Sequence, residues 1–198
     1  MSKVAWLFPG QGSQAVGMGM AFAAAEPASQ AVLAEADAAL GFALSQVMAE
    51  GPEETLKLTE HTQPAILTHS TMVVRACGAR LPRPDFVAGH SLGEYSALVA
   101  AGALTFADAV RTVRERGRAM QTAVPVGVGA MAAIIGMKVE DVEAGCREAA
   151  EATGKVVVPA NFNGAGQVVI AGHAEAVDAA IEVLKGKGGR KMVKLPVS

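Results

Sequence analysis

A five-residue motif, Gly89-His90-Ser91-Leu92-Gly93, most constrains the fold of this chain. It follows a short apolar run, Phe86-Val87-Ala88, that predicts a strand, and it precedes a segment expected to be helical from about Gly93. So tight a turn leaves no room for neighbouring side chains, which explains a glycine on each side of the serine. The motif predicts a nucleophile elbow, with the Ser91 hydroxyl exposed and the Leu92 N–H directed at a developing oxyanion. The alternative is a glycine-rich turn whose serine only caps the helix.

A second glycine-rich loop, residues 9–14, follows the apolar run at residues 4–8, which predicts another strand. Together with Ala15, the loop formally satisfies G-x-G-x-x-A, the dinucleotide-binding pattern. That interpretation requires a second strand ending in an acidic residue about 20 positions later. Residues 28–40 instead have the spacing of an alanine-rich helix, so we reject it. In a serine acyl-transfer site, the loop would supply the second oxyanion N–H, from Gln11; the alternative is an ordinary strand-to-helix turn.

Two further helices are expected in the first half of the chain. Pro64 predicts the first turn of a helix that runs to about Cys77, with Thr62 or Gln63 near its cap. The next helix should open at Thr105, because Thr105-x-x-Asp108 resembles a capping box.

The helix after Thr105 carries several arginines, which its periodicity separates. The expected buried side consists of Phe106, Val110, Val113, Gly117 and Met120, and the expected solvated side of Arg111, Glu115 and Arg118. Arg114 and Arg116 fall on the two flanks of the buried side. An arginine in such a place usually extends its charged end into solvent, so the helix pattern alone gives Arg116 no special role.

Beyond Pro125 the pattern changes to strands at 129–136, 156–160, 167–171 and 191–197. Helices are expected at 139–152 and around 177–184. This βαββαβ order is typical of a ferredoxin-like unit, whose start we place near Val124.

Composition limits the class of protein. Hydrophobic residues make up 51% of the 198 residues and charged residues 18%, so a sizeable core is available. The formal net charge of -2 gives no general attraction to nucleic acid or to an acidic membrane. The N-terminal apolar run is too short for a signal peptide, and no run approaches the ~18–20 residues that span a bilayer. Cys77 and Cys146 are expected to be buried thiols rather than a disulfide or metal site, in a cytoplasmic protein.

The two glycine-rich loops belong to a longer series of motifs. The others are Thr62-Gln63-Pro64-Ala65, Arg116-Gly117, Met120-Gln121, Gly129-Ala130-Met131-Ala132-Ala133, Asn161-Phe162-Asn163 and Gly166-Gln167-Val168-Val169-Ile170-Ala171-Gly172. In this order they resemble the malonyl-CoA:acyl carrier protein transacylase family and the related acyltransferase domains of fatty-acid and polyketide synthases. The resemblance covers the entire chain. It implies an α/β fold: the N-terminal part of a hydrolase-like parallel-sheet core at 1–124, and an inserted ferredoxin-like βαββαβ subdomain at 125–198.

The resemblance also implies roles for single residues. In that family the serine matching Ser91 carries the acyl group, and the N–H groups matching Gln11 and Leu92 hold the oxyanion. The arginine matching Arg116 binds the free carboxylate of the malonyl group, which suits a two-pronged guanidinium. Gln63 and His90 match the substrate-binding part of the site, although His90, next to Ser91 in a sharp turn, should point away from the serine.

The implied reaction moves a malonyl group from coenzyme A to the phosphopantetheine thiol of acyl carrier protein, for fatty-acid synthesis. The coenzyme A thioester is a substrate, and no metal or redox cofactor is needed. Two alternatives stay open. One is a serine esterase or thioesterase that releases acyl groups to water, and the other is an inactive fragment of the transacylase.

The chain departs from the family at its C-terminal end. The family's catalytic histidine, the general base, lies just beyond the segment matching residues 195–198. The histidines of this chain are His61, His69, His90 and His173, and none matches that position. His69 is expected in the core or on its flank and His173 at the surface. We therefore expect an incomplete chain that lacks its general base and the last strands of the hydrolase-like core.

Overall fold

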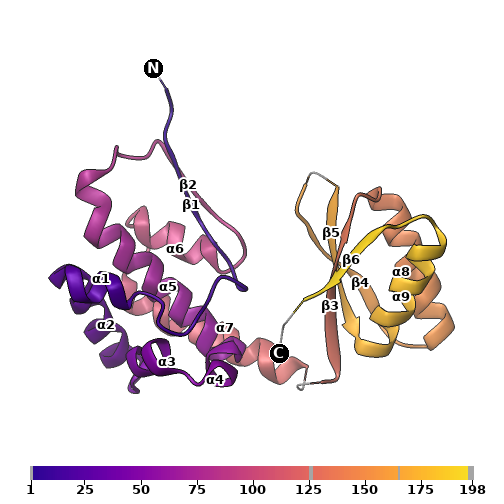
Figure 1. The fold of residues 1–198 in the computed structure, drawn as a ribbon, viewed down its shortest axis with the longest axis horizontal. Coiled ribbons are helices and arrows are strands. Elements are labelled where there is room, and N and C mark those ends of the chain that lie inside the picture. Colours follow the sequence, from indigo (N-terminus) through magenta and orange to yellow (C-terminus); the bar gives the residue numbers. More distant parts are fainter. Residues whose placement is uncertain (1, 125–126, 165, 196–198) are drawn as a thin grey trace. The chain divides into compact units, whose positions relative to one another are not determined.

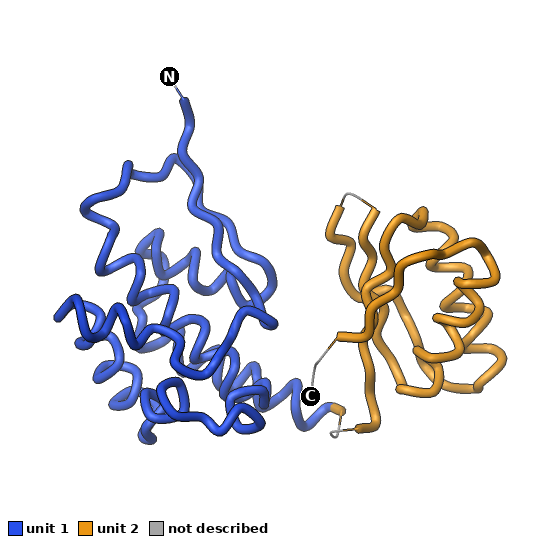
Figure 2. The backbone as a smooth tube through the Cα atoms, viewed as in Figure 1, with its two compact units in different colours: residues 1–123 blue, residues 124–198 orange. Residues whose placement is uncertain are grey.

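Two separate hydrophobic cores divide the chain into two units, residues 1–123 and residues 124–198 (Figure 2). The computed structural model describes residues 2–124, 127–164 and 166–195. The chain is an α/β protein. Within the described ranges, no helix is both long and apolar enough to cross a membrane.

The first unit combines a pair of parallel strands with a set of helices (Figure 1). Strands β1 (Ala5–Phe8) and β2 (Phe86–Gly89) pair in parallel, with Phe8 opposite Gly89 at their carboxyl ends. The helical segments are α1 (Met20–Ala25), α2 (Pro27–Leu40), α3 (Leu44–Glu50), α4 (Glu53–Lys57), α5 (Thr59–Cys77), the 3-10 turn η1 (Gly78–Arg80), α6 (Gly93–Ala100) and α7 (Phe106–Ala123). Helix α6 contacts both strands, and α5 packs against α2, α6 and α7. Helix α6 therefore lies between the strand pair and the two helices, α5 and α7, that carry Gln63 and Arg116.

Helix α5 begins at Thr59, before the predicted start, and Pro64 lies inside it. The Leu58 carbonyl accepts hydrogen bonds from the N–H groups of His61 and Thr62, both at 2.8 Å, so the first turn forms without a proline at its start. A proline in a helix interior removes one backbone hydrogen bond. The prediction was wrong because Pro64 and the four residues after it are buried, and tertiary packing of this kind overrides local propensity.

Helix α7 has the predicted cap but a shorter buried side. The Asp108 N–H donates to Thr105 Oγ1 at 3.1 Å, and the Thr105 hydroxyl donates to the Asp108 carboxylate at 2.7 Å. Phe106, Val110 and Val113 are buried as predicted, whereas the side chain of Met120 is 48% exposed. The core of the first unit does not extend to Met120, because the last turns of α7 run past it.

The second unit is a four-stranded antiparallel sheet with two helices on one of its faces (Figure 1). Its elements are β3 (Gly129–Ile135), α8 (Val139–Thr153), β4 (Val157–Phe162), β5 (Gln167–His173), α9 (Ala174–Gly186) and β6 (Lys191–Lys194). The strand order is β4-β5-β3-β6. Alternate residues of β3 and β5 are buried against α8 and α9. The βαββαβ order is as predicted; β4 and β5 extend further than expected, and the predicted end of the last strand lies partly outside the described residues.

The two cysteines are free, but they differ in burial. Cys146 in α8 is buried, and burial raises the pKa of its thiol to about 11, so it stays protonated at neutral pH. Cys77, at the end of α5, is only half-buried, which is less than predicted. The environment of Cys146 therefore does not favour the thiolate form that a nucleophile or metal ligand requires.

We predict that the first unit loses stability on acidification through His69. Its ring lies edge-on to Phe22 and is half-buried, and burial lowers the pKa of His69 below its ordinary value of about 6.5. The unfolded chain then binds this proton more readily than the folded one, so stability falls as the pH drops below about 6.5. Urea unfolding at pH 7.5 and 5.5, followed by fluorescence of the single Trp6, measures this. A His69→Phe variant with the same pH dependence as the parent chain would contradict it.

Candidate active site

The turn between β2 and α6 has the geometry of a nucleophile elbow. Ser91 has φ of 52°, and among the described residues other than glycine it is the only one with positive φ. That conformation costs an L-residue about 1–2 kcal/mol, so the surrounding structure must impose it. The side chain of Ser91 is exposed, while Leu92 beside it is buried in the core.

Both glycines of the motif are required by contacts between backbone atoms. A Cβ placed on Gly89 would lie 1.9 Å from the carbonyl carbon of Gly93. A Cβ placed on Gly93 would lie 2.2 Å from the carbonyl oxygen of Phe8, at the end of β1. The start of α6 therefore packs directly on both strands, which a helix cap alone would not need.

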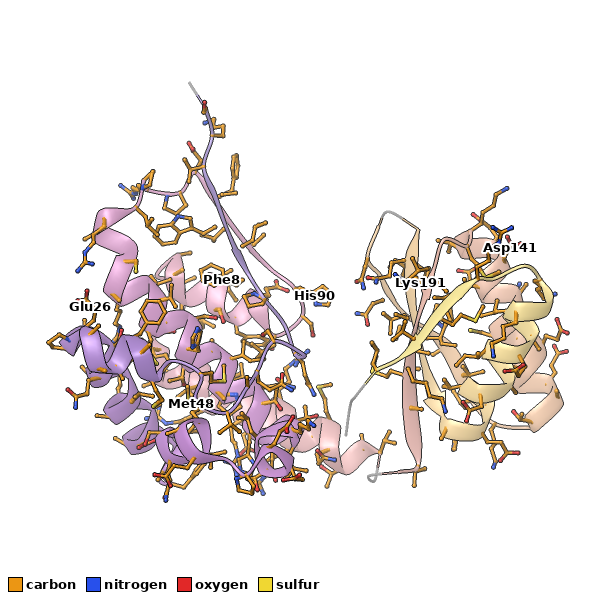
Figure 3. The ribbon with its side chains drawn as sticks, in the orientation of Figure 1. Phe8, Glu26, Met48, His90, Asp141 and Lys191 are labelled. Atoms are coloured by element: carbon orange, nitrogen blue, oxygen red, sulfur yellow. The ribbon has the colours of Figure 1, made fainter. Side chains whose placement is uncertain are left out.

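The loop at 9–14, here called the Gln11 loop, lies beside the elbow. The His90 N–H donates to the Phe8 carbonyl at 3.1 Å, and a Cβ on Gly10 would lie 2.5 Å from the His90 carbonyl oxygen. Figure 3 shows His90 on the turn that follows β2, where its side chain is exposed. This adjacency is what two oxyanion donors from Gln11 and Leu92 would require, and their roles stay predictions.

Arg116 connects the serine with α5. Its Nη2 donates to Ser91 Oγ at 3.1 Å, and its Nη1 donates to Gln63 Oε1 at 2.6 Å. The guanidinium carbon lies 5.8 Å from the centroid of the Tyr95 ring, close enough for a cation–π attraction. Gln63 is fully buried, and its Nε2 lies 3.3 Å from the Met120 sulfur. Three residues that the sequence singled out, from three different elements, therefore meet at one place.

The position of Arg116 follows from how closely α7 approaches α5. A Cβ on Gly117 would lie 2.6 Å from the carbonyl oxygen of Thr59 and 2.7 Å from the Cα of Glu60. The absence of a side chain at Gly117 lets the two helices touch, which brings its neighbour Arg116 within reach of Gln63. On the other flank, Arg114 pairs with Glu60 at 3.3 Å and lies over the Phe42 ring at 4.3 Å. The two flanking arginines thus have different partners, although the helix pattern treats them alike.

The remaining histidines have other surroundings. His61 Nδ1 lies 3.0 Å from the Thr55 carbonyl oxygen, and His69 packs against Phe22, on the flank of the core as predicted. His173 is exposed and precedes α9 in the second unit, as predicted. In the part of the chain that the structure describes, no group of three or more His, Cys, Asp or Glu side chains could hold a metal ion.

Sequence reasoning missed the contributions of Tyr95 and Thr59 to this site. Tyr95 lies one turn after Ser91 on α6, a spacing that could have placed its ring near whatever approaches the serine. Thr59 left no comparable signal, because the predicted helix started after it. Its contact with Gln11 depends on the tertiary fold alone.

The comparison with known families agrees with this geometry. The family model described as "Acyl transferase domain" matches residues 5–197. The chain belongs to the acyl transferase domain family.

Relatives of this acyl transferase domain have closely similar sequences and structures. Over its full length it is 52% identical to the malonyl CoA-acyl carrier protein transacylase of Escherichia coli K12, and 50% identical to that of Bacillus subtilis 168. The solved structure of the malonyl CoA-acyl carrier protein transacylase from Coxiella burnetii matches with a TM-score of 0.93 at 46% identity, over 100% of this chain and 62% of that one. A type II PKS acyl-carrier protein in complex with its malonyl-transacylase matches with a TM-score of 0.92 at 46% identity, over 100% of this chain and 63% of that one. The chain spans 64% of the Escherichia coli relative and 62% of the Bacillus subtilis one.

In this acyl transferase domain, we predict that Gly89→Ala destabilises the first unit by about 3 kcal/mol or more, because the added methyl group meets backbone that cannot move aside. Gly78→Ala is the matched control, since a Cβ there would meet only side chains at 3.7 Å and beyond. It should change stability by less than about 0.5 kcal/mol. Urea unfolding monitored by Trp6 fluorescence compares the two, and equal losses of stability would contradict the proposed elbow packing.

Proposed function

We propose that this chain carries the acyl-binding part of an enzyme that transfers a malonyl group from coenzyme A to the phosphopantetheine thiol of acyl carrier protein, for fatty-acid synthesis. One observation carries the proposal: the hydrogen bond between Arg116 and the Ser91 hydroxyl on a strained elbow. An exposed serine in this turn is suited to accept an acyl group. A cation within hydrogen-bonding distance of it is suited to an acyl group that ends in a carboxylate.

In the proposed reaction, Ser91 Oγ attacks the thioester carbonyl carbon of malonyl-CoA and its proton passes to a general base. The N–H groups of Gln11 and Leu92 would stabilise the oxyanion of the tetrahedral intermediate. The intermediate collapses as the carbon–sulfur bond breaks, and coenzyme A leaves with a proton to give malonyl-Ser91. The carrier-protein thiol then attacks the ester, and Ser91 recovers its proton. By the family resemblance, the general base is a histidine that follows the segment matching 195–198.

Arg116 would select the acyl group. In malonyl-Ser91, only two carbon atoms separate the ester oxygen from the carboxylate carbon, so a guanidinium 3.1 Å from Ser91 Oγ lies within reach of the carboxylate. Nη1 of Arg116 donates to Gln63, and the Tyr95 ring lies near the guanidinium. The Nη2 group of Arg116 is therefore the one that faces Ser91. An acetyl group has no carboxylate and would leave the half-buried guanidinium without an anionic partner, which disfavours it. His90, on the turn beside Ser91, is proposed to contact the substrate.

The partner and domain assignments rest on similar reasoning. An acyl carrier protein is the proposed acceptor, supported by the related malonyl-transacylase whose complex with an acyl-carrier protein has been solved. We propose that the first unit is the N-terminal part of a hydrolase-like core, supported by its parallel strands and the elbow. The second unit is proposed to be a ferredoxin-like subdomain, supported by its antiparallel order β4-β5-β3-β6 and its βαββαβ succession. No cofactor enters the proposed chemistry, because the thioester is already activated.

Ser91 acylation tests the proposal directly. We predict that incubation of the chain with malonyl-CoA adds the mass of one malonyl group, and that the adduct is absent in Ser91→Ala. Intact-mass spectrometry, followed by peptide mapping, measures this. No adduct on the parent chain would favour the alternative of an inactive fragment, and rapid loss of the adduct to water would favour an esterase.

Donor preference tests the role of Arg116. We predict that the parent chain acylates faster with malonyl-CoA than with acetyl-CoA, and that Arg116→Ala lowers the malonyl rate by about 100-fold, because a charged hydrogen-bond partner is lost. Arg118→Ala is the control, since Arg118 is exposed on the same helix and pairs with Glu115. It should acylate at the parent rate. Equal rates with both donors, or an unaffected Arg116→Ala variant, would show that Arg116 does not select the acyl group.

A further inference from the structure

Thr59, the first residue of α5, contacts two segments that the proposed mechanism uses. Its side chain is almost completely buried, with 4% exposed. The Thr59 hydroxyl oxygen accepts a hydrogen bond from Gln11 Nε2 at 3.2 Å. Its backbone N–H donates to Gln121 Oε1 on α7 at 3.3 Å. The Gln11 loop and the end of α7 are therefore tied to the same residue.

The contact with Gln11 matters because of the residues on either side of it. Gln11 lies between Gly10 and Gly12, and Gly12 has φ of 106°, a conformation open mainly to glycine. The hydrogen bonds of the two Gln11 peptide groups stay within the loop: Ser13 Oγ donates to the Gly10 carbonyl at 2.9 Å, and the Gly12 N–H donates to Gln14 Oε1 at 2.8 Å. The hydrogen bond from the Gln11 side chain to the buried first residue of α5 fixes this loop to a segment outside it. Because the side chain and the backbone N–H share one residue, anchoring the first limits the rotation of the second.

The contact with α7 acts on the other half of the site. Gln121 lies about one turn beyond Arg116 and Gly117, and Gly117 packs on the Thr59 carbonyl. The end of α7 therefore contacts both backbone groups of Thr59: the side chain of Gln121 accepts from the N–H, and Gly117 packs on the carbonyl. A shift of Thr59 would move the arginine helix and the Gln11 loop together.

We propose that Thr59 is a positioning residue that sets the direction of the Gln11 N–H relative to Ser91 and Arg116. It acts through Gln11 and Gln121. The inference rests on the proposed function, because the role of the Gln11 N–H is that of an oxyanion donor. Removal of the Thr59 hydroxyl should therefore slow Ser91 acylation without weakening the binding of malonyl-CoA.

The test compares three variants of the chain in time-resolved acylation by malonyl-CoA. Thr59→Val removes the hydroxyl and keeps the shape, Thr59→Ser keeps the hydroxyl, and Thr71→Val removes another buried α5 hydroxyl, which donates to the Leu67 carbonyl. We expect Thr59→Val to lower the limiting acylation rate about tenfold, with the half-saturating malonyl-CoA concentration unchanged. The limiting acylation rate of Thr59→Ser should stay within about twofold of the parent rate, and that of Thr71→Val should equal the parent rate. A parent-like Thr59→Val, or an equal loss in Thr71→Val, would overturn the proposal.

A second measurement does not depend on acylation. The chain is labelled with ¹⁵N-glutamine, and the Gln11 signals are assigned by their loss in Gln11→Asn. We expect the backbone and side-chain amide signals of Gln11 to shift in Thr59→Val and to stay near the parent positions in Thr59→Ser and Thr71→Val. Unshifted Gln11 signals in Thr59→Val would overturn the inference. If the parent chain forms no malonyl adduct, the proposed function fails for this chain, while the Gln11 signals still decide the role of Thr59 as an anchor.

Discussion

The site depends on one close approach, the packing of the first turn of α6 on the carboxyl end of β1. Gly93 lies against the Phe8 carbonyl, and Gly89 lies against Gly93, so the chain between them has to turn within Ser91 itself. The positive φ of that serine is the result. The strain of about 1–2 kcal/mol is sustained because Leu92 is held in the core and α6 contacts both strands. The Ser91 hydroxyl is exposed for the same reason that the neighbouring Leu92 is buried.

The serine turn could be predicted from sequence because its cause is local. Steric exclusion around Gly89 and Gly93 acts over five residues and leaves a readable pattern. The start of α5 could not be predicted in that way. Pro64 indicates a helix start by its local geometry, and only the burial of the segment explains why the helix begins at Thr59 instead. The assignment of Met120 to the buried side failed similarly, because helical periodicity gives a direction and not the point at which the core ends.

The arginines of α7 illustrate the limit of periodicity for the site. Arg114 and Arg116 are both flanking positions by helical angle, yet one guanidinium lies over Phe42 and the other beside Ser91 and Gln63. Their difference arises from the segments that pack on each side of α7, and the sequence of one helix does not specify those neighbours. The strands of the second unit were easier to place, because short apolar runs such as Val168-Val169-Ile170 are signals within the segment itself.

The contacts that exclude side chains at Gly89, Gly93 and Gly117 are made largely by backbone atoms. A clash with a side chain can be relieved by trimming that side chain elsewhere, but a clash with a carbonyl group has no such second-site remedy. A side chain at any of these three positions would therefore require the backbone itself to shift. Gln63, Tyr95 and Met120 meet the guanidinium, or the amide that holds it, through side chains alone. Under the proposed function, a different acyl preference would have to arise through such side chains.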